Sequence, residues 1–341
     1  MRPTPVVSVV TPAYNGAEFL DECIQSVLKQ SYQDWEYVIY NNRSTDDTAR
    51  IAEGYAARDP RIRVVHAPDF ASLWGNHNRA LKAIAPESRY CKIVHADDLL
   101  YPECLERMVA IADAHPSVGI VSSYRLVGKS VEHGGLLSLG EAVMPGRDAA
   151  RRILLHATPP WPDLGWVTGS PTSLLVRTDF LRARPDFYDE TLWHSDPDAA
   201  LRVLMHSDLG FVHQVLTYTR LHAKSMTPVS YRVNTFLAEQ GRLLARYGPT
   251  ALTADEHRTK MRQWMRQYAW LIVKQTAKLS HYRHQGFRGF HERNIAAALS
   301  EAGGDRMLRA TLLLCQGVLR IPPPWGSGAS AGPASPASQA E

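Results

Sequence analysis

The chain has 341 residues, of which 45% are hydrophobic and 21% are charged, and its formal net charge is +4. This length and composition are typical of a globular protein with one large or two modest domains. The small net charge gives no global indication of nucleic-acid binding, so we expect no nucleic-acid partner.

The four cysteines, Cys23, Cys91, Cys104 and Cys315, stand singly in apolar stretches without the spacing of a zinc site. Buried free thiols in a reducing compartment are their expected state. The first residues enter an apolar run directly and lack the charged-then-apolar pattern of a signal peptide. The most apolar C-terminal stretch, 307–321, is too short and too often interrupted by polar residues to span a membrane. These patterns predict a cytoplasmic protein.

Apolar runs rich in β-branched or aromatic residues alternate with segments in which apolar residues recur every three or four positions. The runs predict strands and the recurrences predict helices. Their alternation predicts parallel strands joined by crossover helices, so we expect an α/β sandwich with a mostly parallel central sheet. Pro12 is expected to end the first strand. The predicted strands are 6–10, 37–40, 61–65, 91–94 and 118–121, and the predicted helices are 20–28, 48–55, 76–84 and 105–112.

Three loops follow predicted strand ends, where ligands bind in sheets of this kind: 11–16, 41–46 and 95–98. In the third loop Asp97 and Asp98 stand side by side after a buried strand, and a hard divalent cation would relieve their repulsion. The alternative is a solvated aspartate before the next helix, stabilised by the helix dipole. Spacing alone does not choose between the two.

The loop 41–47 is dense in short polar side chains. Ser44 or Thr45 is suited to cap the helix that follows. Two asparagines and an aspartate of the same loop are equally suited to hydrogen-bond a base and a ribose. No glycine-rich phosphate-binding pattern follows any predicted strand, which argues against dinucleotide-dependent dehydrogenases and P-loop enzymes. A nucleotide bound here would need a metal that bridges its phosphates.

Three motifs occur in sequence: Val9 to Asn15, Ser44-Thr45-Asp46, and Ala96-Asp97-Asp98. Together they resemble the family-2 inverting glycosyltransferases of GT-A fold. The resemblance implies that the first two motifs bind the nucleotide. It also implies that the third corresponds to the family's Asp-x-Asp motif, so that Asp97 binds Mg²⁺ or Mn²⁺ on the donor diphosphate. The implied nucleotide-sugar-binding residues are Thr11, Pro12, Ala13, Tyr14, Asn15, Asn41, Asn42, Ser44, Asp46, Asn78, His95, Ala96 and Asp97.

The resemblance extends to about residue 225. The segment 188–202 resembles the one that carries the family's catalytic base, and it places Asp196 in that role. The proline after Asp196 equally suits an aspartate that caps a helix. The segment 219–225 resembles the family's closing motif, whose histidine approaches the metal or the diphosphate. His222 takes that place as a second metal candidate.

Three positions depart from the family pattern. His95 stands where the family often has the first carboxylate of Asp-x-Asp, Asn41 and Asn42 replace a common aspartate pair, and Ser195 replaces an acidic residue before the base. The amide oxygen of Asn41 can still accept a hydrogen bond from a uracil or thymine imide. A UDP-sugar is therefore the expected donor.

The C-terminal third has a helical pattern from about residue 229 to 319. We expect a catalytic domain at 1–226, a helical subdomain at 227–321 and a disordered tail at 322–341. Between Gly241 and Arg293 there are 11 Lys and Arg and 3 Asp and Glu, an excess of 11 − 3 = +8. This excess is either an ordinary solvated helix face or a peripheral contact with an anionic inner membrane face.

The function that the resemblance implies is metal-dependent transfer of a hexose, with inversion, from a nucleotide-diphosphate sugar to a hydroxyl of a glycan or lipid-linked acceptor. Biosynthesis of cell-surface polysaccharide is the expected process. Trp161 and Trp166, near a loop that resembles the acceptor border, are either stacking platforms for a sugar or core residues. The alternative function is non-catalytic binding of nucleotide sugars or glycans. A nucleotidyltransferase is disfavoured because the loop 13–16 contains no Lys or Arg.

Overall fold

The computed structural model describes residues 6–132, 139–156, 168–222, 227–277, 286–302 and 304–320. Trp161, Trp166 and the predicted tail at 322–341 lie outside these ranges. The chain divides into two compact units, the first made of Met1–Ile153, Trp161–Thr191 and Ser195–His222, and the second of Leu154–Pro160, Leu192–His194 and Ala223–Glu341. The second unit therefore takes in two short stretches that the sequence pattern placed in the N-terminal domain.

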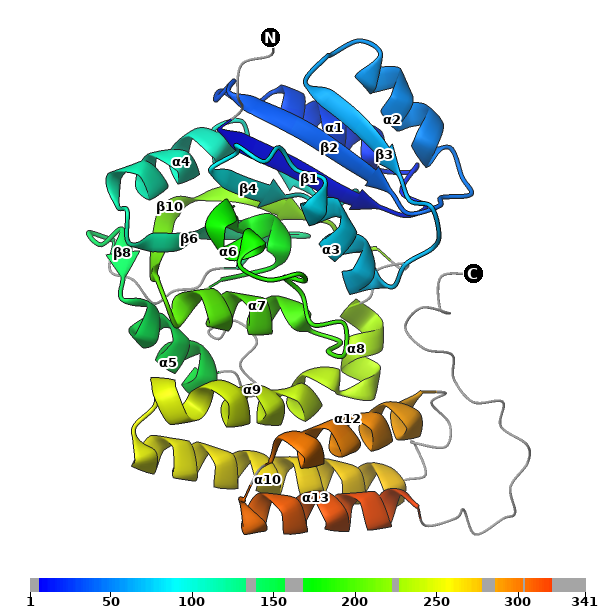
Figure 1. Ribbon diagram of the computed structural model, residues 1–341. Helices are drawn as coiled ribbons and strands as arrows, with labels where there is room; N and C mark the ends of the chain where they lie inside the picture. The colour runs from blue at the N-terminus through cyan, green and yellow to red at the C-terminus, as the bar shows by residue number, and fades with distance from the viewer. Residues whose placement is uncertain are drawn as a thin grey trace. The chain divides into compact units, whose positions relative to one another are not determined.

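The first unit is built on a ten-stranded mixed sheet (Figure 1). Its strands are β1 Val7–Ala13, β2 Trp35–Asn41, β3 Ile62–His66, β4 Tyr90–Ile93, β5 Leu99–Leu100, β6 Val118–Val127, β7 Ser130–Glu132, β8 Val143–Met144, β9 Leu175–Arg177 and β10 Asp208–Thr219. The order across the sheet is β3-β2-β1-β4-β9-β6-β10-β5, with β7 on β6 and β8 on β10. β1 to β4 are mutually parallel, as are β6 and β10, whereas β9 runs antiparallel between β4 and β6.

Helices connect the strands of the first unit and cover the sheet (Figure 1). In α1 the residues Leu20, Cys23, Ile24 and Val27 form the buried stripe that the sequence spacing predicts. The α/β class with a mostly parallel central sheet is thereby confirmed. The helices are α1 Leu20–Leu28, α2 Thr48–Ala56, α3 Leu73–Lys82, α4 Cys104–Ala114, α5 Gly146–His156, α6 Thr178–Arg182 and α7 Ser195–Leu204, with a short 3-10 helix at Pro171–Ser173.

Pro12 lies inside β1, so the prediction that it ends the strand was wrong. On the β4 side, the last backbone bond runs from Val94 N to Val10 O, and pairing of β1 with β4 stops at Val10. On the β2 side, pairing continues to Ala13, whose carbonyl accepts from Asn42 N. The backbone polar groups of successive residues point to opposite neighbouring strands. The nitrogen of Pro12 therefore faces β4, beyond the end of the hydrogen-bond ladder between β1 and β4. Its missing N–H breaks no strand hydrogen bond there.

In the described part of the region that follows residue 223, the second unit contains the helices α8 Thr227–Val233, α9 Thr235–Ala251, α10 Ala254–Ala277, α12 Phe287–Glu301 and α13 Arg306–Leu319. α9 packs against α10 and α12, and α13 packs against the same two helices. Trp264 and Tyr268 stack in the core with ring centroids 5.2 Å apart. Among the described residues, no helix combines the length and the apolar character needed to cross a membrane.

The stretch Leu192–His194 is held tightly within this second unit. The buried carboxylate of Glu239 accepts the backbone N–H of Trp193 at 2.6 Å and that of His194 at 2.8 Å. The His194 ring stacks on Phe236 with centroids 3.6 Å apart. The carboxylate thus accepts hydrogen bonds from two part-buried backbone donors of this stretch.

Candidate active site

The carboxyl ends of β1 and β2 are tied together by the polar loops that follow them. Asn15 Oδ1 accepts the backbone N–H of Thr45 at 2.8 Å, and Ser44 Oγ accepts the backbone N–H of Asn15 at 3.0 Å. Asn15 has φ of 47°, a left-handed conformation that asparagine tolerates better than most residues. The two predicted nucleotide-binding loops therefore form one connected surface.

Asp46 fixes the start of both α1 and α2. Its Oδ2 accepts the backbone N–H of Ala17 at 3.0 Å, and its Oδ1 accepts both the N–H and the hydroxyl of Thr48. Partial burial acts to raise the pKa of Asp46, but these hydrogen bonds outweigh it and the pKa is lowered. The predicted cap at Ser44 or Thr45 is wrong: Asp47 is the N-cap residue of α2 and makes no side-chain capping hydrogen bond, while Ser44 Oγ accepts from Asn15 instead.

Three predicted donor-binding side chains have structural roles. Thr11 is fully buried and donates its hydroxyl to Val94 O at 2.8 Å, which joins β1 to the end of β4. The amide of Asn42 both donates to Ala71 O and accepts from Ala71 N, each at 2.9 Å. The amide of Asn78 pairs with the backbone of Tyr188 in the same reciprocal way. The polar side-chain atoms of these three residues are engaged in the interior, and their contact with a donor stays a prediction.

Asn41 is also largely buried, and its Oδ1 accepts the backbone N–H of Ser44 at 3.1 Å. The oxygen that was predicted to meet a nucleobase thus already holds the loop, although a carbonyl oxygen has a second lone pair. Nearby, the Tyr14 ring meets the exposed Phe70 ring edge to face, with centroids 4.9 Å apart. Sequence reasoning did not single out Phe70, because a lone exposed aromatic in a loop carries no periodic signal.

The two adjacent aspartates after β4 are in different environments. Asp98 is 2% exposed, and its carboxylate accepts the Thr172 hydroxyl at 2.7 Å and the Arg220 backbone N–H at 3.2 Å. The Asp97 side chain is 34% exposed, and its Oδ2 lies 2.9 Å from His222 Nε2. Asp98 therefore holds the loop in place, and Asp97 faces the open site.

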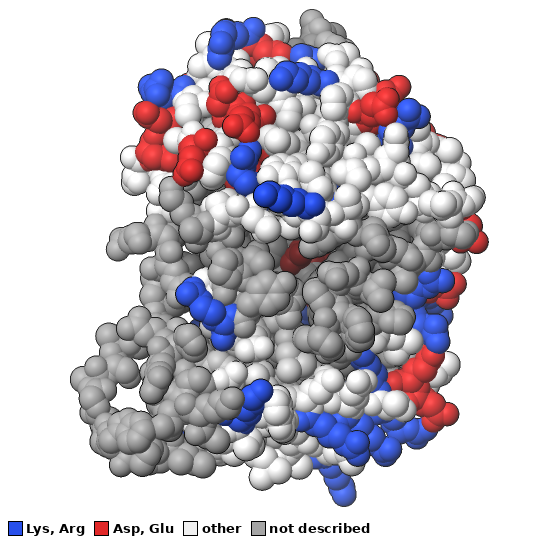
Figure 2. All heavy atoms as spheres, turned by 180° about the vertical axis from the view of Figure 1, so that it is seen from behind, with Lys and Arg blue, Asp and Glu red and all other residues white. Residues whose placement is uncertain are grey.

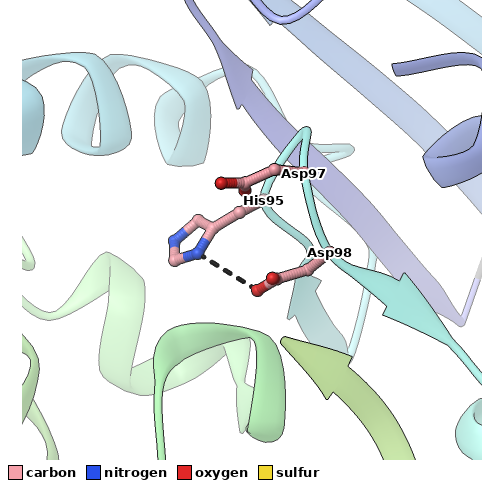
Figure 3. Close-up of side chains that lie close together, drawn as sticks. All are labelled: His95, Asp97 and Asp98. Atoms are coloured by element: carbon pink, nitrogen blue, oxygen red, sulfur yellow. Dashed lines mark ion pairs between the residues drawn. The ribbon is translucent and has the colours of Figure 1, made fainter. Parts of the chain in front are cut away.

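Asp97 and His222 have the geometry and chemistry to bind a divalent cation. Two ligands at neighbouring positions of an octahedral ion, each about 2.1 Å from it, lie about 3 Å apart. The observed 2.9 Å between Asp97 Oδ2 and His222 Nε2 matches that spacing. One atom from each of His95, Asp97 and Asp98 also lies within 4.8 Å of the others (Figure 3). The residues present thus fit Mg²⁺ or Mn²⁺, with Asp97 and His222 as the available ligands.

Both ring nitrogens of His95 face other side chains. Nδ1 lies 3.5 Å from Asp98 Oδ2, and Nε2 lies 3.1 Å from Nε2 of His77, a buried residue of α3. Burial acts to lower the pKa of His95, but the Asp98 hydrogen bond and the charges of Asp98, Asp97 and Asp196 raise it. Burial, together with the charge of His95, lowers the pKa of His77 to about 3. His77 was missed by sequence reasoning, which read α3 only as a helix.

Asp196 is in the first turn of α7 and is half-buried. Burial raises its pKa to about 6, partly offset by a backbone hydrogen bond and by the charges of His95 and Arg125. The preceding Ser195 is fully buried and accepts the backbone N–H of Asp189 through its hydroxyl at 2.6 Å. A carboxylate with this pKa is ionised near neutral pH and is more basic than an ordinary aspartate.

Parts of the chain are similar to known proteins. Residues 8–162 match the family model described as Glycosyl transferase family 2. The chain is 36% identical over 109 residues to the uncharacterized glycosyltransferase EpsJ of Bacillus subtilis, covering 32% of this chain and 31% of that protein. It is 25% identical over 273 residues to the uncharacterized protein MT1568 of Mycobacterium tuberculosis, covering 79% and 83%. The chain spans between 14% and 56% of the length of the first curated relatives that it matches.

Two solved structures share the fold. S. aureus TarS 1-349 in complex with UDP-GlcNAc superposes with a TM-score of 0.64 at 15% identity, covering 92% of this chain and 90% of that one. The mannosyltransferase PcManGT from Pyrobaculum calidifontis, in complex with GDP-Man and Mn²⁺, superposes with a TM-score of 0.53 at 18% identity, covering 93% and 80%. At these identities the likeness concerns the fold.

Proposed function

Because residues 8–162 match the family model described as Glycosyl transferase family 2, we propose that the protein transfers a sugar from a nucleotide-diphosphate sugar to an acceptor hydroxyl, with inversion at the anomeric carbon. The observation that carries the proposal is the pairing of Asp97 with His222 in the site that also contains Asp196. The charges of Asp97 and Asp196 both act on His95, which lies near each of them. Asp97 and His222 suit the binding of a diphosphate, and Asp196 suits the role of proton acceptor.

Asp196 is the proposed general base. Its carboxylate takes the proton of the acceptor hydroxyl while the hydroxyl oxygen forms a bond to the anomeric carbon. The bond from that carbon to the diphosphate oxygen breaks in the same step, and the nucleoside diphosphate leaves with the electron pair. A pKa of about 6 keeps Asp196 ionised at neutral pH, while its basicity is higher than that of an exposed aspartate. Attack opposite to the leaving group gives inversion.

Asp97 and His222 are the proposed ligands of the Mg²⁺ or Mn²⁺ ion. When bound, the ion supplies Lewis-acid stabilisation of the leaving diphosphate. Asp98 contributes by fixing the loop: its bonds to Thr172 and Arg220 hold the peptide that carries Asp97. The aromatic pair of the half-buried Tyr14 and the exposed Phe70 suits a nucleobase.

A UDP-hexose is the proposed donor, and a glycan or lipid-linked hydroxyl of a cell-surface polysaccharide is the proposed acceptor. Support comes from Asn41, whose amide oxygen has one lone pair free of the Ser44 bond. The TarS structures with UDP-GlcNAc and UDP support the same class of donor. The four cysteines are buried and free, which supports a reducing, cytoplasmic setting.

The proposal is tested by screening UDP-, GDP- and dTDP-sugars with purified protein, with and without Mn²⁺. Release of nucleoside diphosphate is followed in the presence of candidate acceptors, and proton NMR of the product reports the anomeric configuration. We expect metal-stimulated release from one UDP-sugar and an inverted product. Tight nucleotide-sugar binding by calorimetry with no release under any condition would favour the non-catalytic alternative. A retained configuration would refute direct displacement by the Asp196-activated hydroxyl.

A further inference from the structure

Exposed apolar side chains concentrate on two neighbouring helices of the second unit. α10 and α13 pack side by side (Figure 1). Five of the eleven exposed large apolar residues in the described part of the chain lie on these two helices: Trp270 and Val273 on α10, and Met307, Leu313 and Leu314 on α13. Leu314 is 73% exposed and Trp270 is 61% exposed, so these are not side chains at the edge of the core. We call these five residues the α10/α13 face.

α13 is apolar on both its inner and its outer side. Leu308, Leu312, Cys315 and Leu319 form the buried stripe. Met307, Leu313 and Leu314 follow the same three-to-four-residue spacing on the outside, together with the exposed Ala310 and Gly317. A helix on the surface of a protein normally places polar residues outward, and a helix that is apolar all round is normally covered. The outer stripe therefore indicates a partner.

Cationic side chains accompany the apolar ones. Helices α10 and α13 together contain seven Lys and Arg and two Asp and Glu, an excess of 7 − 2 = +5. Both acids are in the first turn of α10, and Asp255 pairs with Arg258. Lys and Arg side chains, with some Asp and Glu among them, lie over the C-terminal helices in the space-filling view (Figure 2).

Arginine and tryptophan share one stripe of α10. Arg262, Arg266, Trp270 and Val273 are all exposed and are spaced by four, four and three residues, so they line up along the helix. The Lys274 ammonium lies 4.2 Å from the centroid of the Trp270 ring. On α13, Arg306 and Arg309 are exposed beside the apolar stripe. Exposed cations and bulky apolar groups are thus interspersed along each of the two neighbouring helices.

We propose that the α10/α13 face binds the surface of an anionic lipid bilayer. Apolar side chains can enter the boundary between headgroups and acyl chains, tryptophan is favoured at that boundary, and arginine and lysine reach the headgroup phosphates. A second copy of the chain is disfavoured as the partner, because it would place the exposed cations of two such faces against each other. Membrane contact would bring the enzyme to lipid-linked acceptors; only that consequence rests on the proposed function.

The test is cosedimentation of the full-length protein with sucrose-loaded vesicles, without any nucleotide sugar. Vesicles of phosphatidylcholine alone are compared with vesicles that contain 30% phosphatidylglycerol. We expect binding only to the anionic vesicles, weakened about tenfold or more when NaCl is raised from 0.1 to 0.5 M. Since no sugar transfer is measured, failure here leaves the proposed function untouched, and an inactive enzyme leaves this result untouched.

Two double variants and two controls make the test specific. Arg262→Glu/Arg266→Glu and Leu313→Glu/Leu314→Glu should each reduce vesicle binding at least tenfold. Matched changes at exposed sites of the first unit, Arg184→Glu and Leu139→Glu, should leave it unchanged. All the altered side chains are exposed, so equal melting temperatures verify that each variant is folded.

A second readout locates the contact. Brominated lipids should quench the fluorescence of the protein, and Trp270→Phe should remove a distinct part of that quenching. Absence of binding to anionic vesicles at 0.1 M NaCl would overturn the proposal. So would sedimentation velocity showing that the protein forms a dimer that Leu313→Glu/Leu314→Glu dissociates, because the face would then be an interface between copies.

Discussion

His222 Nε2 lies 2.9 Å from Asp97 Oδ2, although 125 positions separate the two residues in the chain. The contact joins the loop after β4 to the segment after β10. Arg220 supports it, since its backbone N–H donates to Asp98 and its guanidinium donates to the Asp97 carbonyl at 3.2 Å. The segment after β10 is therefore fastened to both aspartates, by its backbone at Asp98 and by its imidazole at Asp97.

The two aspartates should respond differently to the same substitution. Asp97→Asn removes a charged ligand from an exposed position, so we expect kcat/KM with Mn²⁺ to fall on the order of 1000-fold with little change in the melting temperature. Asp98→Asn weakens bonds to Thr172 and Arg220 in the interior, so we expect a loss of about 1–3 kcal/mol in the free energy of unfolding. Steady-state kinetics and urea denaturation of the two variants check this. Equal kinetic and stability losses in both would contradict the division of roles.

The pH dependence should report Asp196. The pKa of about 6 exceeds the ordinary value of 3.8, so the folded state binds more protons between these pH values and its stability falls as pH rises through that window. Activity rises through the same window as the base ionises. Asp196→Asn should therefore melt at a higher temperature than the natural protein at pH 7.5 but not at pH 3.5, while kcat falls about 100-fold or more. An Asn variant with normal turnover would refute the base assignment.

Lys92 should be a source of instability. It is fully buried in β4, and its Nζ donates to the Met108 sulfur at 3.5 Å, a weak acceptor. Burial lowers the pKa of Lys92 in the folded protein below 10.5. Between that lowered pKa and 10.5 the unfolded state binds more protons than the folded state, so stability rises with pH up to about 10.5. Lys92→Met should raise the free energy of unfolding at pH 7 by about 1–3 kcal/mol and flatten that pH dependence. Lys129→Met, at an exposed site, is the control and should change neither.

Glu239 should be needed for the integrity of the second unit. Removing its carboxylate leaves the part-buried backbone donors of Trp193 and His194 without their acceptor. We expect Glu239→Ala to cost about 2–4 kcal/mol of unfolding free energy. Glu301→Ala is the comparison for this loss of unfolding free energy. It removes a carboxylate that pairs with Arg242 and Arg246, and these two side chains can turn toward solvent only in part. If Glu239→Ala unfolded at the same denaturant concentration as the natural protein, the clamp would be energetically unimportant.

The fold was largely predictable because its signals are local. The β-branched runs at 6–10 and 61–65 and the apolar stripe of α1 specify parallel strands and crossovers without long-range information. Pro12 was misread because its effect depends on where β4 stops, which is a property of the neighbouring strand. β9 was missed because three residues are too few to show a period.

The site was predictable only in part. The sequence singled out Asp97 by its place after a predicted strand, and it singled out Asp196 by the motif resemblance. The roles of Thr11, Asn42 and Asn78 could not, because a polar side chain in a loop gives no sign of whether it faces solvent or a buried peptide group. The pairing of His77 with His95 joins two elements and has no counterpart in local spacing.

The distance in sequence between Asp97 and His222 also bears on how the protein is made. A ribosome that has released the loop after β4 must still synthesise 125 residues before the imidazole emerges. Throughout that interval the growing chain contains Asp97 without His222. The pair therefore cannot bind a divalent ion or guide early folding. Any truncation before residue 222 would yield a fragment that lacks His222, one of the two proposed cation ligands.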